Sequence, residues 1–223
     1  MFAARHRPSV PSDVSRETLA LVGVHVPRET LVRLECYSDL LLRWNRTVNL
    51  IAQADERDIW TRHIADAAQL APLLTPQATR AIDLGTGAGF PGLVLSLITG
   101  VHFELVEADH RKAAFLAEAV RATGAPVRIH AVRAERARIN PAPVVTARAF
   151  APLLKLVHVA SPLLQEGGML LAQKGRNAED ELTRALAEWH MQVRRIPSRT
   201  APEATILMLS EIHRAGAPKR GAG

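Results

Sequence analysis

The amino-acid sequence predicts an α/β protein built on a mostly parallel, seven-stranded sheet. Three observations lead to this prediction: a short apolar run ends in a glycine-rich turn at residues 85–92, strand-like and helix-like segments alternate after it, and two strand-like segments close the sequence. Alternation of this kind is typical of parallel sheets that carry helices on both faces.

The glycine-rich turn occupies the end of residues 81–92, Ala-Ile-Asp-Leu-Gly-Thr-Gly-Ala-Gly-Phe-Pro-Gly. Glycine tolerates turns too tight for a Cβ, and the proline suits a helix start, so the pattern predicts strand, turn and helix. Such a turn lets backbone N–H groups approach a nucleotide-like cofactor. Gly85, Gly87 and Gly89 form one cofactor loop. Gly87 and Gly89 also match the dinucleotide fingerprint together with Gly92, so the turn alone leaves both interpretations open.

Two carboxylates accompany the turn. Asp83 ends the strand before the glycines, and Glu107 ends the next apolar run, residues 101–106. A carboxylate at the tip of the second strand is where the two ribose hydroxyls of a bound nucleoside are held. The plainer alternative is a tight turn with a solvated Glu107.

The remaining elements follow from periodicity. We expect strands at 103–107, 127–132, 144–148, 169–173, 193–196 and 205–212, helices at 111–122 and 153–164, and a helix capped by Asn177 with Leu182, Leu186 and Trp189 buried. The connection between the last two strands is too short for a crossover helix, so they are expected to form an antiparallel hairpin. This ending differs from a dinucleotide dehydrogenase and favours the class I (Rossmann-like) methyltransferase sheet.

Three helical patterns precede the first strand. They cover residues 12–22, a segment after Pro27 with Leu34, Tyr37, Leu41 and Trp44 on one face, and residues 55–74 with Trp60, Ile64, Ala67 and Ala71 on one face. We therefore expect a flexible tail at 1–10, a helical cap at 11–77, a methyltransferase domain at 78–213 and a flexible basic tail at 214–223, in one structural unit. The basic tail is either inert or a weak RNA contact.

Composition narrows the class of protein. The 223 residues are 48% hydrophobic and 22% charged, and no apolar run is long enough for a bilayer, so a cytoplasmic globular protein without a membrane or secretory segment is expected. The single cysteine, Cys36, excludes an internal disulfide and a cysteine cluster for zinc, and is expected in the core; no metal is expected. A net charge of +6 favours contact with phosphate backbones.

Further motifs extend the glycine turn over the chain. They are Trp44-Asn45 with Asn49-Leu50, Arg62-His63-Ile64 with Asp66, Arg148-Ala149-Phe150 and Lys174-Gly175. With the turn, and in this order, they resemble the bacterial small-subunit (16S) ribosomal RNA guanine-N7 methyltransferases, historically called glucose-inhibited division protein B. A generic methyltransferase would share only the glycine turn.

The resemblance implies an activity and its partners. The cofactor would be S-adenosylmethionine, and the methyl group would pass to N7 of a guanine in the 530 loop of 16S ribosomal RNA, at position 527 of the RNA. The partner would be this RNA in the small ribosomal subunit or an assembly intermediate, and a monomer is expected. Because guanine N7 carries a lone pair and no proton, direct in-line transfer needs no general base.

The resemblance also assigns site residues. Cofactor contacts would fall on Gly85, Phe90, Ala134, Glu135 and Arg148, beside Asp83, Gly87, Gly89 and Glu107 of the turn and second strand. The family usually has aspartate at the position of Glu107; the longer side chain is expected to keep the ribose contact. Phe90 as plain core and Glu135 as a solvated charge are the alternatives.

The candidates for positioning the nucleotide are Arg62, His63, Asp66, Arg148 and Lys174, and those for contacting RNA are Arg111, Lys112 and Lys174. On one predicted helix, Arg62 lies four residues and His63 three residues before Asp66, so both cations are expected to pair with its carboxylate. The alternatives are a local ion pair there, a surface lysine at 174, and a solvated helix start at 111–112.

Two other functions remain open at this point. One is an NAD-dependent oxidoreductase, which also uses a glycine-rich turn after a strand. The other is a non-catalytic ribosome-associated binding module. The intact turn, Glu107 and Arg148 speak against a module that has lost its activity.

Overall fold

The computed structural model describes residues 12–215. The tails predicted at 1–10 and 214–223 lie outside these residues, except that Arg214 closes the last strand and Ala215 donates its N–H to Glu188. Among residues 12–215, no helix is both long and apolar enough to cross a membrane.

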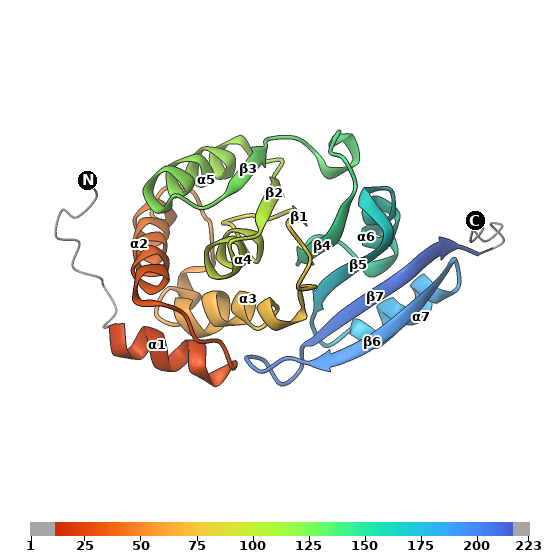
Figure 1. Cartoon of the computed structure of the whole chain (residues 1–223), viewed down its shortest axis with the longest axis horizontal. Helices are drawn as coiled ribbons and strands as arrows, with labels where there is room; N and C mark the ends of the chain where they lie inside the picture. The colour runs from red at the N-terminus through yellow and green to blue at the C-terminus, as the bar shows by residue number, and fades with distance from the viewer. Residues whose placement is uncertain (1–11, 216–223) are drawn as a thin grey trace.

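Seven strands form one sheet in the order β3-β2-β1-β4-β5-β7-β6 (Figure 1). Their bounds are β1 Arg80–Leu84, β2 His102–Val106, β3 Val127–His130, β4 Ala142–Arg148, β5 Leu164–Lys174, β6 Trp189–Pro197 and β7 Thr205–Arg214. Neighbours from β3 to β5 are parallel, and β7 runs antiparallel to both β5 and β6. The predicted sheet with its closing antiparallel hairpin is confirmed.

Four helices connect the strands: α4 Gly92–Thr99, α5 His110–Thr123, α6 Leu153–Ala160 and α7 Ala178–Leu186. The buried face predicted for the last helix is wrong at Leu186, which is 41% exposed. The helix ends at this residue and the chain turns, so Trp189 is buried as the first residue of β6 rather than as part of a helix. Asn177 precedes α7 but its side chain makes no capping hydrogen bond.

The first two predicted helices are confirmed as α1 Ser12–Leu21 and α2 Arg28–Asn45. The single helix predicted over residues 55–74 is wrong. The segment is divided into a 3₁₀ turn η1 Gln53–Asp55, a π-helix η2 Trp60–Ala65, a short α3 Asp66–Ala68 and a 3₁₀ turn η3 Ala71–Leu73.

A tertiary contact and a proline explain why the helix ends soon after Asp66. The Asp66 carbonyl accepts a hydrogen bond from the Gln173 side chain at 2.8 Å, and the N–H of Leu70 donates to Ala67 rather than to Asp66. Pro72 has no N–H to continue a helix. The predicted apolar face persists nevertheless, because Trp60 and Ile64 are buried.

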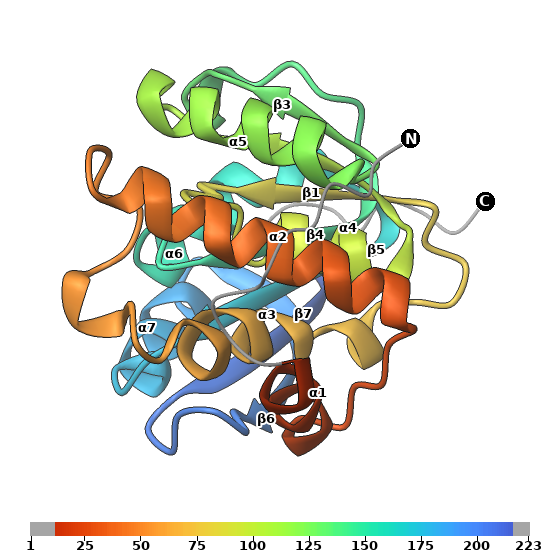
Figure 2. The ribbon, with the colours of Figure 1, turned by 90° about the vertical axis from the view of Figure 1, so that its left-hand side faces the viewer.

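The hydrophobic core has two parts, one on each side of the sheet. The α1–α3 segment, α4 and α5 contribute to one, and α6, α7 and the closing hairpin to the other (Figures 1 and 2). Helix α2 packs along α5 and α4. Because the N-terminal helices share a core with the helices of the sheet, the boundary at residues 77–78 stays a prediction. Cys36 is half-buried on α2 rather than in the core, and burial raises the pKa of its thiol.

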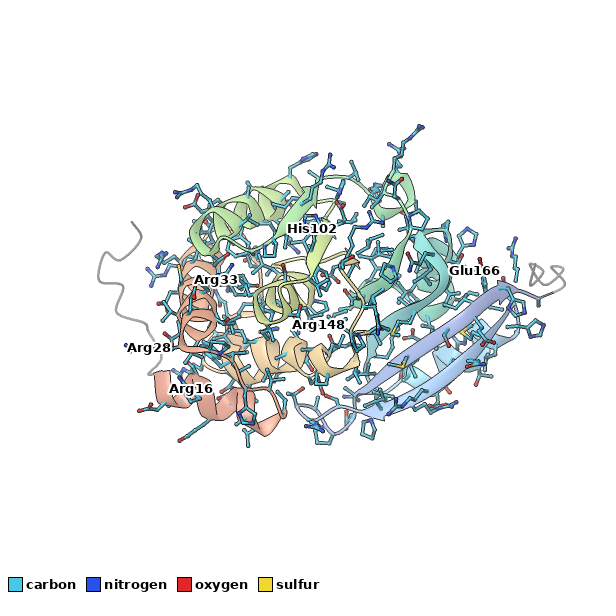
Figure 3. The ribbon with its side chains drawn as sticks, viewed as in Figure 1. Arg16, Arg28, Arg33, His102, Arg148 and Glu166 are labelled. Atoms are coloured by element: carbon cyan, nitrogen blue, oxygen red, sulfur yellow. The ribbon has the colours of Figure 1, made fainter. Side chains whose placement is uncertain are left out.

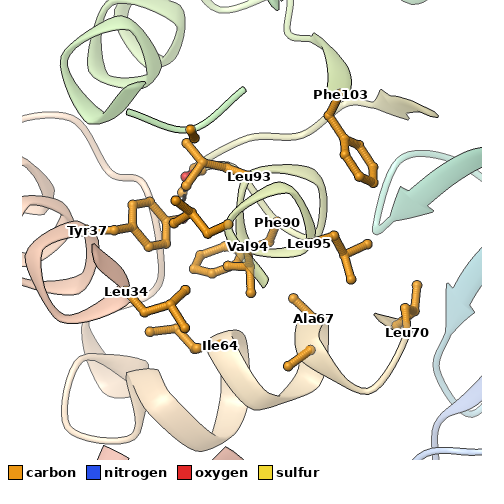
Figure 4. Packing of buried hydrophobic residues seen from close by; sticks show 14 of the residues in the cluster. Leu34, Tyr37, Ile64, Ala67, Leu70, Phe90, Leu93, Val94, Leu95 and Phe103 are labelled. Atoms are coloured by element: carbon orange, nitrogen blue, oxygen red, sulfur yellow. Dashed lines mark hydrogen bonds between the residues drawn. The ribbon is translucent and has the colours of Figure 1, made fainter. Parts of the chain in front are cut away.

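Tyr37 of α2 supports the glycine-rich turn directly. Its hydroxyl donates to the Ala88 carbonyl at 2.6 Å, and its ring meets the Phe90 ring edge-on at a centroid distance of 5.6 Å. Leu34 and Ile64 lie in the same packed region (Figure 4). The N-terminal helices therefore hold the turn in place.

Candidate active site

The glycine-rich turn leaves no room for side chains at two positions. Gly85 has φ of +64°, and a Cβ there would lie 2.6 Å from the Phe150 ring. At Gly92, a Cβ would lie 2.5 Å from Leu105 and 2.7 Å from Cβ of Asp83. The predicted strand–turn–helix is confirmed, and close packing explains why glycine stands at both positions.

Asp83 lies beneath the turn and is fully buried. Its carboxylate accepts hydrogen bonds from the Thr146 hydroxyl at 2.7 Å and the Gly92 N–H at 3.0 Å. Burial raises the pKa of Asp83 to about 6, although hydrogen bonds to the carboxylate act in the opposite direction. Asp83 thus ties β1 to the start of α4, and its predicted contact with the cofactor would be made through the turn.

Glu107 follows β2 and is 8% exposed. One carboxylate oxygen accepts from the Gly87 N–H and the other from the Asp109 N–H, both at 2.8 Å. The solvated Glu107 of the plainer interpretation is therefore wrong. Each carboxylate oxygen has a second lone pair, which leaves acceptor capacity for ribose hydroxyls.

Arg148 ends β4, near the middle of the view in Figure 3. Its side chain connects three parts of the site. Its guanidinium donates to Oδ2 of Asp66 at 3.1 Å and to Nδ1 of His63 at 2.9 Å. The guanidinium carbon lies 4.8 Å from the centroid of the Phe90 ring, on which the His63 ring stacks at 5.1 Å. The structure therefore brings together three of the candidates for positioning the nucleotide, two of them in contact with Phe90 of the glycine-rich turn.

The ion pairs expected within residues 62–66 are wrong. Arg62 pairs with Asp55 at 2.9 Å, and Nε2 of His63 lies 3.4 Å from the same carboxylate. Asp66 instead accepts from the Thr200 hydroxyl at 2.7 Å. The π-helical turn changes which side chains share a face, so the α-helical spacing of three or four residues does not apply.

His63 is neutral near pH 7. Burial, with the charge of Arg148, lowers the pKa of His63 to about 4. Because Nδ1 accepts from Arg148, the proton of the neutral ring lies on Nε2, which faces Asp55. The lone pair of His63 is thus occupied by a guanidinium.

Lys174 ends β5 and is not a surface lysine, since its side chain is 9% exposed. Its ammonium donates to Glu181 of α7 at 2.7 Å and to the Ala151 carbonyl at 2.6 Å. Glu181 also accepts from the Leu153 N–H at 2.7 Å. The sequence analysis missed Glu181, because three consecutive acidic residues open α7 and nothing in the sequence distinguishes the third.

A cleft of about 700 Å³ opens at the carboxyl ends of β4 and β5. Its lining includes Arg62, Asp66, Arg148, Gln173, Lys174, Glu181 and Thr200. Gln173 and Thr200 were also missed, and only their tertiary contacts with Asp66 reveal them. The glycines of the turn do not line the cleft, so Arg148, which contacts Phe90 of the turn, links the two regions.

Four other candidates lie away from this cleft. Ala134 is buried in a 3₁₀ turn, η4 Ala134–Arg136, that follows β3, and the exposed Glu135 pairs with Lys155 at 3.1 Å. Arg111 is exposed at the start of α5, where Lys112 is half-buried. Within residues 12–215, no three histidine, cysteine or acidic side chains are arranged to bind a metal.

The fold is that of the class I S-adenosylmethionine-dependent methyltransferases. Two solved structures share the fold. The ribosomal protein L11 methylase of Lactobacillus delbrueckii subsp. bulgaricus superposes with a TM-score of 0.57 at 15% identity, over 68% of this chain and 79% of that one. A SAM-dependent methyltransferase of Aquifex aeolicus superposes with a TM-score of 0.56 at 12% identity, over 71% of this chain and 94% of that one. At these identities the likeness shows the fold alone.

The particular family follows from closer relatives. Residues 30–206 match the family described as rRNA small subunit methyltransferase G. The chain is 54% identical over 197 residues to the ribosomal RNA small subunit methyltransferase G of Granulibacter bethesdensis, covering 88% of this chain and 92% of that protein. This chain belongs to the family of small-subunit ribosomal RNA methyltransferases G. Membership of a methyltransferase family takes the place of the two alternatives from the sequence, the NAD-dependent oxidoreductase and the non-catalytic binding module.

Proposed function

We propose that this enzyme transfers a methyl group from S-adenosylmethionine to N7 of guanine 527, in the 530 loop of 16S ribosomal RNA. The observation that carries the proposal is the juxtaposition of the glycine-rich turn and the 700 Å³ cleft, with Arg148 in contact with both. A cofactor on the turn and a base in the cleft would meet at this residue. The family membership supports ribosomal RNA as the substrate.

The cofactor site is formed by the turn and the tips of β2 and β4. Glu107 offers acceptors for the ribose hydroxyls while it holds the Gly87 N–H. Gly85 allows the backbone to approach the methionine part, and the Arg148 guanidinium is placed to hold the cofactor carboxylate. Ala134 and Glu135, after β3, flank the adenine.

The transfer itself is a single displacement. The N7 lone pair forms the new C–N bond as the C–S bond breaks, and that bonding pair stays on sulfur as a thioether. The positive charge passes from the sulfonium to the purine, and no proton is removed. The protein supplies alignment, and alignment can account for about 7–11 kcal/mol of the barrier when the reacting groups are well oriented.

The state of His63 supports transfer without a general base. Its Nδ1 accepts a hydrogen bond from Arg148, and its ring stacks on Phe90, so His63 holds the guanidinium over the Phe90 ring. Together with Asp66 it acts as a positioning residue for the guanidinium. The basic composition suits the small ribosomal subunit or an assembly intermediate as the partner, and a monomer acting in the cytoplasm completes the proposal.

The product identifies the reaction. Purified enzyme is incubated with 16S ribosomal RNA and methyl-labelled S-adenosylmethionine, and the RNA is digested and separated by liquid chromatography with mass spectrometry. We expect 7-methylguanosine from the fragment that contains position 527, and none from an RNA with adenine there. Label in another nucleoside, or transfer only to protein, would contradict the proposal.

A further inference from the structure

We propose that Lys174 and Glu181 together read the Watson–Crick edge of the target guanine inside the cleft. The inference rests on the proposed function and extends it to the choice of base. Nothing in the sequence marked Glu181, and the structure places both side chains on the wall of one cavity, 2.7 Å from each other.

Both groups keep unused hydrogen-bonding capacity. The ammonium of Lys174 has three N–H groups, of which two are taken by Glu181 and Ala151. In Glu181, Oε2 accepts from Lys174 and from Leu153, whereas Oε1 accepts from no residue within 12–215. The pair therefore keeps one unused donor and one unused acceptor on two side chains that contact each other.

This order of donor and acceptor matches guanine. The Watson–Crick edge of guanine has the O6 acceptor next to the N1–H and N2–H donors, so Lys174 would donate to O6 while Oε1 of Glu181 accepts from N1–H and N2–H. Adenine has a donor at N6 and an acceptor at N1, the reverse order. Enzymes that modify a base commonly read it at this edge after taking it out of the stack.

The position of the pair leaves N7 accessible. N7 lies on the opposite side of O6 from N1, so a guanine held by its Watson–Crick edge keeps N7 free. Lys174 ends β5, which is separated from β1 and its glycine-rich turn only by β4. Adjacent strands are about 4.8 Å apart, so Lys174 lies roughly 10 Å across the sheet from the glycine-rich turn.

The carboxylate also has an electrostatic role. Methylation at N7 places a positive charge on the purine, and this charge makes N1–H a stronger donor. A carboxylate already bonded to N1–H stabilises the transition state more than the neutral substrate. Glu181 would then affect the rate of transfer as well as binding.

The test compares the parent with Glu181→Gln on RNAs that carry guanine or inosine at position 527. Inosine keeps N7, O6 and N1–H but lacks the N2 amino group. In single-turnover assays we expect the parent to prefer guanine over inosine by about 10- to 100-fold, which corresponds to the loss of one hydrogen bond to a charged group. In Glu181→Gln the amide oxygen is needed to accept from Lys174 and Leu153, so the amide nitrogen takes the place of the free acceptor Oε1. The preference for guanine over inosine should therefore fall to within about threefold.

The matched control is Glu179→Gln, two residues earlier on α7, which removes an exposed carboxylate bonded to Arg195 at 2.8 Å. It should keep the parental preference. The proposal is overturned if the parent treats both bases alike, or if Glu181→Gln keeps the preference. If Glu181→Gln and Glu181→Asp both unfold, Glu181 serves the fold alone and the proposal also fails. Absence of 7-methylguanosine from the parent's product would instead refute the proposed function.

Discussion

Arg148 donates to Nδ1 of His63 at 2.9 Å, and this bond joins the end of β4 to the π-helical segment at residues 60–65. The same guanidinium pairs with Asp66 and lies over Phe90. A residue of the sheet, a residue of the glycine-rich turn and two residues of the N-terminal helices thus form one unit. The predictions below follow from this arrangement and from the turn beside it.

The first prediction concerns His63. Asparagine can offer an oxygen near the place of Nδ1, so His63→Asn should keep the single-turnover rate within about tenfold, whereas loss of a general base typically costs 10²- to 10⁴-fold. His63→Phe, which has no acceptor for Arg148, should weaken cofactor binding. Because the pKa of His63 is about 4, the parental rate should show no histidine-dependent acid limb between about pH 6 and 8.5. A 10²-fold loss in His63→Asn with normal binding would show that His63 takes a proton.

Gly85 provides the second prediction. Gly85→Ala should lower the affinity for S-adenosylmethionine at least about tenfold in calorimetry, because the new Cβ would displace Phe150 and strain a backbone with φ of +64°. Gly85→Asp should abolish binding by adding a charge. Gly100→Ala is the matched control: its φ is +75°, but no atom lies within 4 Å of the new Cβ. Equal losses in both alanine variants would mean that backbone strain, not the contact at Gly85, limits binding.

The third prediction uses the buried Asp83. Its pKa is about 6 in the folded state, above the usual 3.8, so the folded protein binds more protons between these values. The contribution of Asp83 to stability is therefore largest below about pH 4 and is lost as pH rises through 6. Asp83→Asn should gain stability relative to the parent over this window, on the order of 2–3 kcal/mol.

Urea unfolding at pH 4.5 and pH 7.5 measures this difference. Exposed Asp180 serves as the comparison, since Asp180→Asn should change stability equally at both pH values. A pH-independent difference between Asp83→Asn and the parent would show that Asp83 is not protonated more readily in the folded state.

The fourth prediction concerns RNA binding. With 28 lysine and arginine residues in the chain, phosphate contacts should dominate the affinity for RNA. If 6–10 phosphates are contacted, the affinity should fall by about 10³- to 10⁵-fold between 50 and 200 mM salt through counterion release. Fluorescence anisotropy measures it, and the affinity for the cofactor, measured in the same buffers, should barely change. A flat RNA titration would refute the electrostatic argument.

The sequence predicts best what is determined locally. The turn at residues 85–92 and the short connection before β7 depend on nearby residues, and both were predicted correctly. The end of the helix after Asp66 was not, because Gln173, more than 100 residues away, bonds to the Asp66 carbonyl. Glu181 was missed for a different reason: it is one of three consecutive acidic residues, and its partner Lys174, seven residues away, lies across a strand end and a turn rather than on the same helix.

The central claim is that guanine N7 accepts the methyl group, and replacing this one atom tests it. A 16S ribosomal RNA with 7-deazaguanine at position 527 has a C–H in place of N7 and an unchanged Watson–Crick edge. In a single-turnover assay with labelled S-adenosylmethionine, it should bind like the guanine RNA and receive no methyl group. Methyl transfer to the 7-deazaguanine RNA at the rate of the guanine RNA would contradict the account.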